Sequence, residues 1–190
     1  MRFTRVRLLL FTTLFGSYIV IFALLYLATA TGESALTNYQ FFAGSGVVCG
    51  FSSTACPDIS QAKDGSTIEL SGEGTFSLQA KSAFGSGSYT RKAASGSIIG
   101  TGTWTAYELI SFKSYGTSLN LPSDYEGGLA KFRLLLRPTS GFLGFHALLE
   151  VECNIGRPPA SAIEGITLTT SGKGVNFSKK ISGSTLFVRN

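Results

Sequence analysis

Histidine, cysteine and recognisable catalytic motifs are scarce in this sequence of 190 residues. His146 is the only histidine, and the cysteines Cys49, Cys56 and Cys153 lack the second Cys or His pair that a structural zinc site needs. No G-x-S-x-G nucleophile motif occurs, so no serine is singled out as a partner for His146. We therefore expect no metal, no cofactor and no serine-hydrolase site.

Long basic runs are also missing. The chain has sixteen Lys and Arg and eleven Asp and Glu, but Arg2, Arg5 and Arg7 lie in the first thirty residues. Residues 31–190 therefore carry thirteen basic and eleven acidic side chains, and no Lys or Arg run there exceeds two residues. Nucleic-acid binding depends on a basic surface, so we expect no nucleic-acid partner.

The first thirty residues have the pattern of an export signal. The three arginines precede an uncharged run, residues 8–28, and an Ala-x-Ala motif ends at Ala30. A run of about twenty residues is longer than a usual signal-peptide core, so an uncleaved membrane anchor is the alternative. In both cases we expect a secreted or cell-surface protein that contacts the membrane only through residues 8–28.

Export to an oxidising compartment favours a disulfide. Cys49 and Cys56 lie in one short Gly- and Ser-containing loop and are the expected pair, whereas Cys153 lies in an apolar strand pattern and is expected to be buried. Residues 31–65 show little periodicity, and we interpret them as an N-terminal arm that this disulfide closes. Residues 66–190 are expected to form the folded domain.

Short β-prone runs follow Gly65, with no helical pattern among them. The expected strands are residues 67–71, 74–80, 86–92, 97–115, 129–137, 145–155, 163–170 and 184–189. About eight strands in this length predict an all-β fold, an antiparallel meander that closes into a small barrel, with a β-sandwich as the alternative.

A glycine motif recurs three times in these runs, as "GEGTF" from Gly72, "GSGSYT" from Gly85 and "GTGTWT" from Gly100. Residues two apart share one face of a strand, so each glycine pair shares a face with the aromatic residue that follows it. A glycine pair leaves a hole that a ring from a neighbouring strand can cover, and it lets a sheet coil sharply. Ordinary glycine-rich turns are the alternative interpretation.

The best hairpin lies between Gly128 and Ile155. Its inward faces are Ala130, Phe132, Leu134 and Leu136 on one strand, and Ala147, Leu149, Val151, Cys153 and Ile155 on the other. A symmetric loop predicts the pairs Arg133–Glu150, Lys131–Glu152, Leu135–Leu148 and Arg137–His146. We interpret the polar face as a solvated ladder of ion pairs rather than as an acid–base site.

Glu108 is the carboxylate most suggestive of function, because alternation places it on one face with Trp104, Ile110 and Phe112. Such a carboxylate lies at a barrel mouth, is buried with a raised pKa, or is paired with an Arg or Lys. Asn176 begins an N-glycosylation pattern, "NFS".

The GxGxW motif at Gly100, Gly102 and Trp104 resembles the signature of small calyx barrels of the lipocalin and avidin type. The repeated glycine and aromatic strands also resemble secreted barrels of the dirigent and allene oxide cyclase class. The resemblance covers roughly residues 66–112 and implies a small secreted barrel.

These patterns lead to one principal functional hypothesis and two alternatives. The first is a non-catalytic barrel that binds a small apolar or amphipathic molecule, in a site lined by Trp104, Glu108, Ile110, Phe112, Tyr89 and Phe76. The second is a structural module of the cell envelope or matrix that self-associates through strand edges or the aromatic arm. An enzyme of the cyclase or isomerase kind ranks third.

Overall fold

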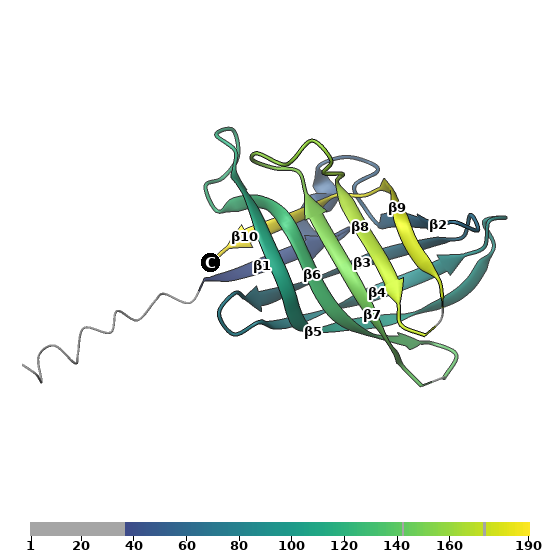
Figure 1. Cartoon of the computed structure of the whole chain (residues 1–190). Helices are drawn as coiled ribbons and strands as arrows, with labels where there is room; N and C mark the ends of the chain where they lie inside the picture. Colours follow the sequence, from purple (N-terminus) through teal and green to yellow (C-terminus); the bar gives the residue numbers. More distant parts are fainter. Residues whose placement is uncertain (1–36, 142, 173) are drawn as a thin grey trace, which may run out of the picture. The chain divides into compact units, whose positions relative to one another are not determined.

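The computed structural model describes residues 37–141, 143–172 and 174–190, which form ten β-strands and one short 3₁₀ helix (Figure 1). The elements are β1 (Asn38–Ala43), η1 (Gly46–Gly50), β2 (Asp58–Ala62), β3 (Thr67–Ser77), β4 (Ser82–Lys92), β5 (Ile98–Thr117), β6 (Tyr125–Pro138), β7 (Phe145–Cys153), β8 (Gly165–Thr170), β9 (Asn176–Ser182) and β10 (Thr185–Arg189). The predicted export signal or anchor, residues 1–30, lies outside the described residues. Within the described ranges no helix is long and apolar enough to cross a membrane.

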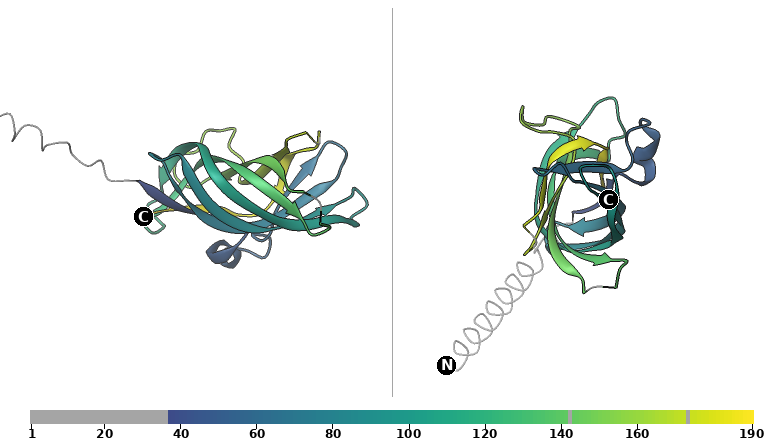
Figure 2. Two further views of the ribbon diagram at one scale, coloured as in Figure 1. Left: turned by 90° about the horizontal axis from the view of Figure 1, so that it is seen from below. Right: turned by 90° about the vertical axis from the view of Figure 1, so that its right-hand side faces the viewer.

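All strand pairs in these ranges are antiparallel, which confirms the predicted all-β antiparallel fold. From β2 to β9 each strand pairs with the next, and β9 pairs back with β2. Strands β1 and β10 pair with each other. Strand β1 also pairs with β3, and β10 with β6, so the two strands connect β3 to β6. The sheet curves strongly, as the two views of Figure 2 show.

The strand predictions succeeded best after residue 66. The two runs expected over 67–71 and 74–80 are one strand, β3, and the long run expected over 97–115 is the single strand β5. Strands β1, β2 and β9 were not predicted. Both β1 and β2 lie in the segment expected to be an arm, so residues 38–43 and 58–62 belong to the sheet and not to an arm.

Trp104 covers two glycines of the repeated motif. It is fully buried, and a Cβ built on Gly72 would lie 2.1 Å from its Cζ2 atom, while one built on Gly87 would lie 2.6 Å from its Nε1 atom. The indole N–H donates a hydrogen bond to the carbonyl of Ser71 at 3.3 Å. This is the ring-on-glycine packing that the repeat predicts.

Two further rings pack in the same way. A Cβ on Gly74 or Gly85 would lie 2.8 or 2.9 Å from the ring of Phe41, and one on Gly102 would lie 2.7 Å from the hydroxyl of Tyr89. Side chains are excluded at these positions because the rings occupy the space. The repeat is therefore a packing device and not a set of turns.

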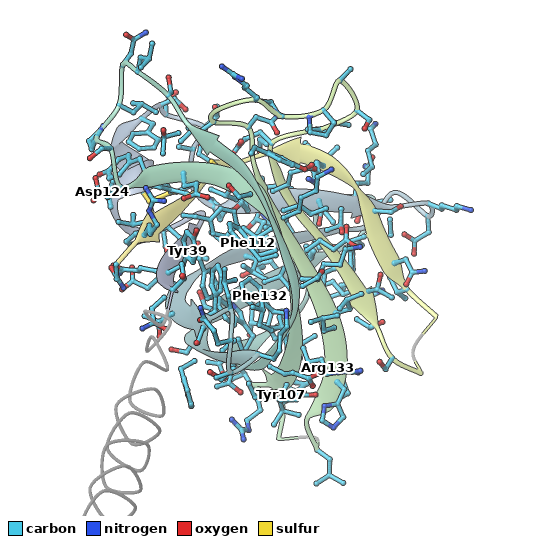
Figure 3. All side chains as sticks on the ribbon, turned by 60° about the vertical axis from the view of Figure 1, so that its left-hand side comes forward. Tyr39, Tyr107, Phe112, Asp124, Phe132 and Arg133 are labelled. Atoms are coloured by element: carbon cyan, nitrogen blue, oxygen red, sulfur yellow. A yellow bond between two sulfur atoms is a disulfide. The ribbon has the colours of Figure 1, made fainter. Side chains whose placement is uncertain are left out.

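Aromatic side chains fill the core beside this layer. The rings in mutual contact are Tyr39, Phe41, Phe76, Phe112, Phe132 and Phe187. Centroid distances run from 4.6 Å between Phe41 and Phe132 to 6.4 Å between Phe41 and Trp104, the range of favourable aromatic pairs. Figure 3 shows Tyr39, Phe112 and Phe132 among the side chains enclosed by the strands, and Tyr107 and Arg133 toward the periphery.

Strand β5 does not alternate regularly. Its register against β6 shifts between Ala106 and Glu108, between Leu109 and Ser111, and between Ser114 and Gly116. Each bulge inserts one residue and reverses the face of those that follow. Leu109 is consequently buried, Ile110 is exposed, and the Glu108 side chain is 45% exposed. The prediction that Trp104, Glu108, Ile110 and Phe112 share one face is therefore wrong.

The β6–β7 hairpin has the predicted faces but not the predicted register. The expected apolar residues are buried except Ile155, which is half-buried and lies beyond the end of β7. Lys131 lies opposite Glu150 and Arg133 opposite Leu148, two residues from the prediction. Arg133 instead pairs with Glu108 of β5, with 2.9 Å between Nε and Oε2.

The register shift moves the β6–β7 loop by one residue. Leu136 lies opposite Phe145, the first residue of β7, but β6 continues to Pro138 because Arg137 and Pro138 pair with β5. The loop therefore begins one residue earlier than symmetry predicts.

The predicted disulfide between Cys49 and Cys56 is confirmed, with 5.2 Å between the two Cα atoms. It closes the segment that joins β1 to β2 through η1. Cys153 is buried and has no disulfide partner, and burial raises the pKa of its thiol to about 12. It behaves as a small apolar side chain, as predicted.

We expect Gly87→Ala to lower the free energy of unfolding by roughly 1–3 kcal/mol, because its Cβ would lie 1.9 Å from the Ser71 carbonyl oxygen. The matched control is Gly100→Ala, since a Cβ on Gly100 meets nothing within 4 Å and the change should stay within about 0.5 kcal/mol. Urea unfolding of both variants measures the difference. Equal losses would contradict the packing described here.

Candidate functional site

A cavity of about 250 Å³ lies at the end of the sheet where β3 and β7 begin and β4, β6 and β8 end. We call this end the mouth. The lining residues are Ile68, Tyr89, Arg91, Leu136, Phe145, Thr170 and Val175. Most of this lining is apolar, and Arg91 supplies its charge. An apolar hollow with a few polar groups is the usual form of a small-molecule site.

A second cavity, of about 380 Å³, adjoins the first at the mouth. Both are lined by Tyr89, Arg91 and Phe145, and the second adds Ile99 and Gly100 at the start of β5. Because a Cβ on Gly100 would meet nothing within 4 Å, the absence of its side chain keeps this space open.

Arg91 lies directly between the two cavities. It pairs with Ile68 on one side and with Gly100 on the other. Its guanidinium carbon lies 5.9 Å from the centroid of the Phe177 ring, within cation–π range. Its Nε atom is buried and finds no hydrogen-bond acceptor among the residues that the structure describes.

The six predicted ligand residues do not form one site. Trp104 and Phe76 are buried in the packed core, and Phe112 packs against that core. As described above, the bulges of β5 turn two others, Glu108 and Ile110, outward. Tyr89 lines both mouth cavities.

Arg91 was not among the predicted site residues, although the sequence held a signal for it. Alternation along β4 places Gly85, Gly87, Tyr89 and Arg91 on one face. That face is the inner one, since Tyr89 is buried. Extending this alternation from Tyr89 by two residues would have placed the charged side chain of Arg91 on the inner face, near the end of β4.

Comparison of the chain with protein-family models, curated proteins and solved structures finds no match. The likeness to calyx barrels therefore rests on Gly100, Gly102 and Trp104 alone.

A second group of ionisable side chains lies away from the mouth. Lys180 donates a hydrogen bond to Glu152 at 2.6 Å, and Thr185 donates two to Glu164, from its backbone N–H at 2.7 Å and its hydroxyl at 2.8 Å. Burial alone would raise the pKa of Glu152, but the bond and charge of Lys180 help to lower it. Burial raises the pKa of Glu164.

Asp58 belongs to this group but lacks such bonds. It is fully buried, and neither carboxyl oxygen has a hydrogen-bond partner among the described residues. Burial, and then the charge of Glu164, raise its pKa to about 9, while Lys180 acts in the opposite direction. A Cβ on Gly183 would lie 1.9 Å from Asp58 Oδ1, so backbone packs directly against the carboxyl. We interpret Asp58 as a neutral structural acid.

We expect Asp58→Asn to remove much of the loss of stability that the protein suffers as the pH rises. The folded state keeps the Asp58 proton until about pH 9, whereas the unfolded chain loses it near the ordinary value of 3.8. The folded state thus binds the extra proton between these values, and stability falls by roughly 1.4 kcal/mol per pH unit across that window.

Urea unfolding at pH 5, 7 and 8.5 measures the slope for the parent and the variant. The exposed Asp124, in the loop before β6, provides the matched control Asp124→Asn, which should leave the slope unchanged. Glu164 retains some dependence in both proteins. Parallel profiles for the parent and Asp58→Asn would contradict a neutral Asp58.

Proposed function

We propose that this chain is an exported, non-catalytic β-barrel that binds a small apolar or amphipathic molecule at its mouth. The observation that carries the proposal is the pair of adjoining cavities that share Tyr89, Arg91 and Phe145. Pairing of β9 back to β2 supports a barrel, and the Cys49–Cys56 disulfide is compatible with export.

The mouth suits a ligand better than the centre does. Trp104, Phe41 and Phe132 are fully buried and fill the interior with rings in contact. The smaller cavity is lined by the half-buried Phe145 beside the buried side chains of Ile68 and Leu136. A ligand that buries an apolar portion there gains the hydrophobic free energy of that contact without displacing the core.

Self-association is less well supported. Every described strand has at least two partners, although the β8–β9 and β6–β10 ladders extend over only two residue pairs each. The aromatic segment expected to be exposed is β1, whose Tyr39, Phe41 and Phe42 are buried. The aromatic segment and most of the strand edges on which that alternative depended are therefore occupied within this chain.

We expect the protein, as exported by its producing cells, to bind the neutral probe N-phenyl-1-naphthylamine with a saturable rise in fluorescence. Gly100→Leu should weaken this binding at least tenfold, because its side chain would enter the larger cavity without a clash. Titration of the probe against both proteins measures the change.

The matched control is Thr103→Leu, an equally large apolar side chain on the exposed face of the same strand. It should bind the probe as the parent does. Absence of saturable binding to the parent, or unchanged binding to a folded Gly100→Leu, would overturn the mouth as the ligand site.

A further inference from the structure

We propose that the ligand is an amphipathic anion whose acidic head group binds the guanidinium of Arg91 while its apolar tail occupies the mouth cavities. This inference rests on the proposed function and names the class of its ligand. The common chemistry is a carboxylate or phosphate on an alkyl chain.

The position of Arg91 gives the first argument. Alternation continues from Tyr89 to Arg91 on the inner face of β4, and Arg91 lines both cavities. Its cross-strand neighbour Gly100 contributes no side chain, so the guanidinium is not covered from β5. An incoming head group can therefore approach it through the mouth.

The bonding of Arg91 gives the second argument. Its buried Nε lacks an acceptor within the described ranges, and none of the ion pairs found there includes this residue. Asp64, the carboxylate whose charge interacts with Arg91, already accepts two hydrogen bonds from Ser66. Burying a charged donor without an acceptor is costly, and a planar guanidinium matches a carboxylate or phosphate.

The neighbouring cation shows the contrast. Lys92, the next residue on β4, points away from Arg91 and pairs with Glu69 across the β3–β4 ladder. Its charge is satisfied within the protein. Arg91 instead faces the cavities, where an anion would complete its hydrogen bonds.

Apolar residues at the mouth explain why the anion should carry a tail. Ile68, Leu136, Phe145 and Val175 lie in the smaller cavity beside Arg91. Three exposed apolar side chains lie in the segments next to these cavities, namely Ile98 and Ile99 at the start of β5 and Leu143 in the β6–β7 loop. A small inorganic anion would leave this surface in water, whereas an alkyl chain would cover it.

Ligands with the same ten-carbon chain and different head groups test the contribution of the acidic head group separately from that of the tail. Decanoate, decyl phosphate and 1-decanol are each titrated against the protein carrying N-phenyl-1-naphthylamine, and their displacement of the probe is measured. We expect decanoate or decyl phosphate to bind at least tenfold more tightly than 1-decanol. The two acids distinguish a carboxylate from a phosphate preference.

Variants assign that preference to Arg91. In Arg91→Gln, decanoate and decyl phosphate should bind no more tightly than 1-decanol, and the affinity for 1-decanol should be unchanged. Lys92→Gln removes a positive charge at the next residue and should still bind the two acids more tightly than the alcohol. If Arg91→Gln does not fold, the comparison of acid with alcohol on the parent protein still decides the question.

The outcomes separate the two proposals. Equal binding of decanoate, decyl phosphate and 1-decanol to the parent, or an acid preference that survives in Arg91→Gln, overturns the anionic ligand but leaves the mouth site standing. Failure of all three, together with no saturable probe binding, overturns both.

Discussion

The close packing of large rings on glycines is the constraint on which the rest of this structure depends. Trp104 lies where Gly72 and Gly87 have no Cβ, and Phe41 lies over Gly74 and Gly85. A ring this close to two neighbouring backbones requires that β3, β4 and β5 keep their relative register. It also lets the sheet coil tightly enough for its ladder to return from β9 to β2. Where these ring layers end, at Tyr89 and Arg91, the cavities of the mouth begin.

Much of this was predictable because it is local. Residue parity predicted the inward faces of β6 and β7, and the glycine repeat predicted the packing of rings on glycines. The short loop between Cys49 and Cys56 predicted the disulfide. Strand β1 was missed for a physical reason: Phe41 and Phe42 are both buried, one in the main core and the other in a smaller cluster with Val48 and Leu186. A strand covered on both faces shows no alternation, so its sequence lacks the signal by which strands are recognised.

The prediction that Trp104, Glu108, Ile110 and Phe112 share one face is wrong because long-range strand pairing overrides residue parity. Nothing in the sequence between Ala106 and Glu108 marks a bulge, since neither glycine nor proline occurs there. The bulge arises from the match between β5 and β6, and it places Glu108 in an ion pair with Arg133, one of the three environments expected for this carboxylate. The other aromatic candidates were correctly placed inside but serve the core. Tyr89 alone among the six reaches the cavities at the mouth.

Asp58 is fully buried and Arg91 is half-buried, and each has a buried polar atom without a hydrogen-bond partner among the described residues, but the two imply different things. A carboxyl can avoid the cost of a buried charge by keeping its proton, and the raised pKa of Asp58 describes that solution. Backbone at Gly183 packs directly against this carboxyl. An arginine has no such option, because its guanidinium stays charged in proteins. Its remaining ways to lower the cost are the Phe177 ring, water or an anion from outside, and the apolar lining that surrounds Arg91 favours an anion with a tail over water.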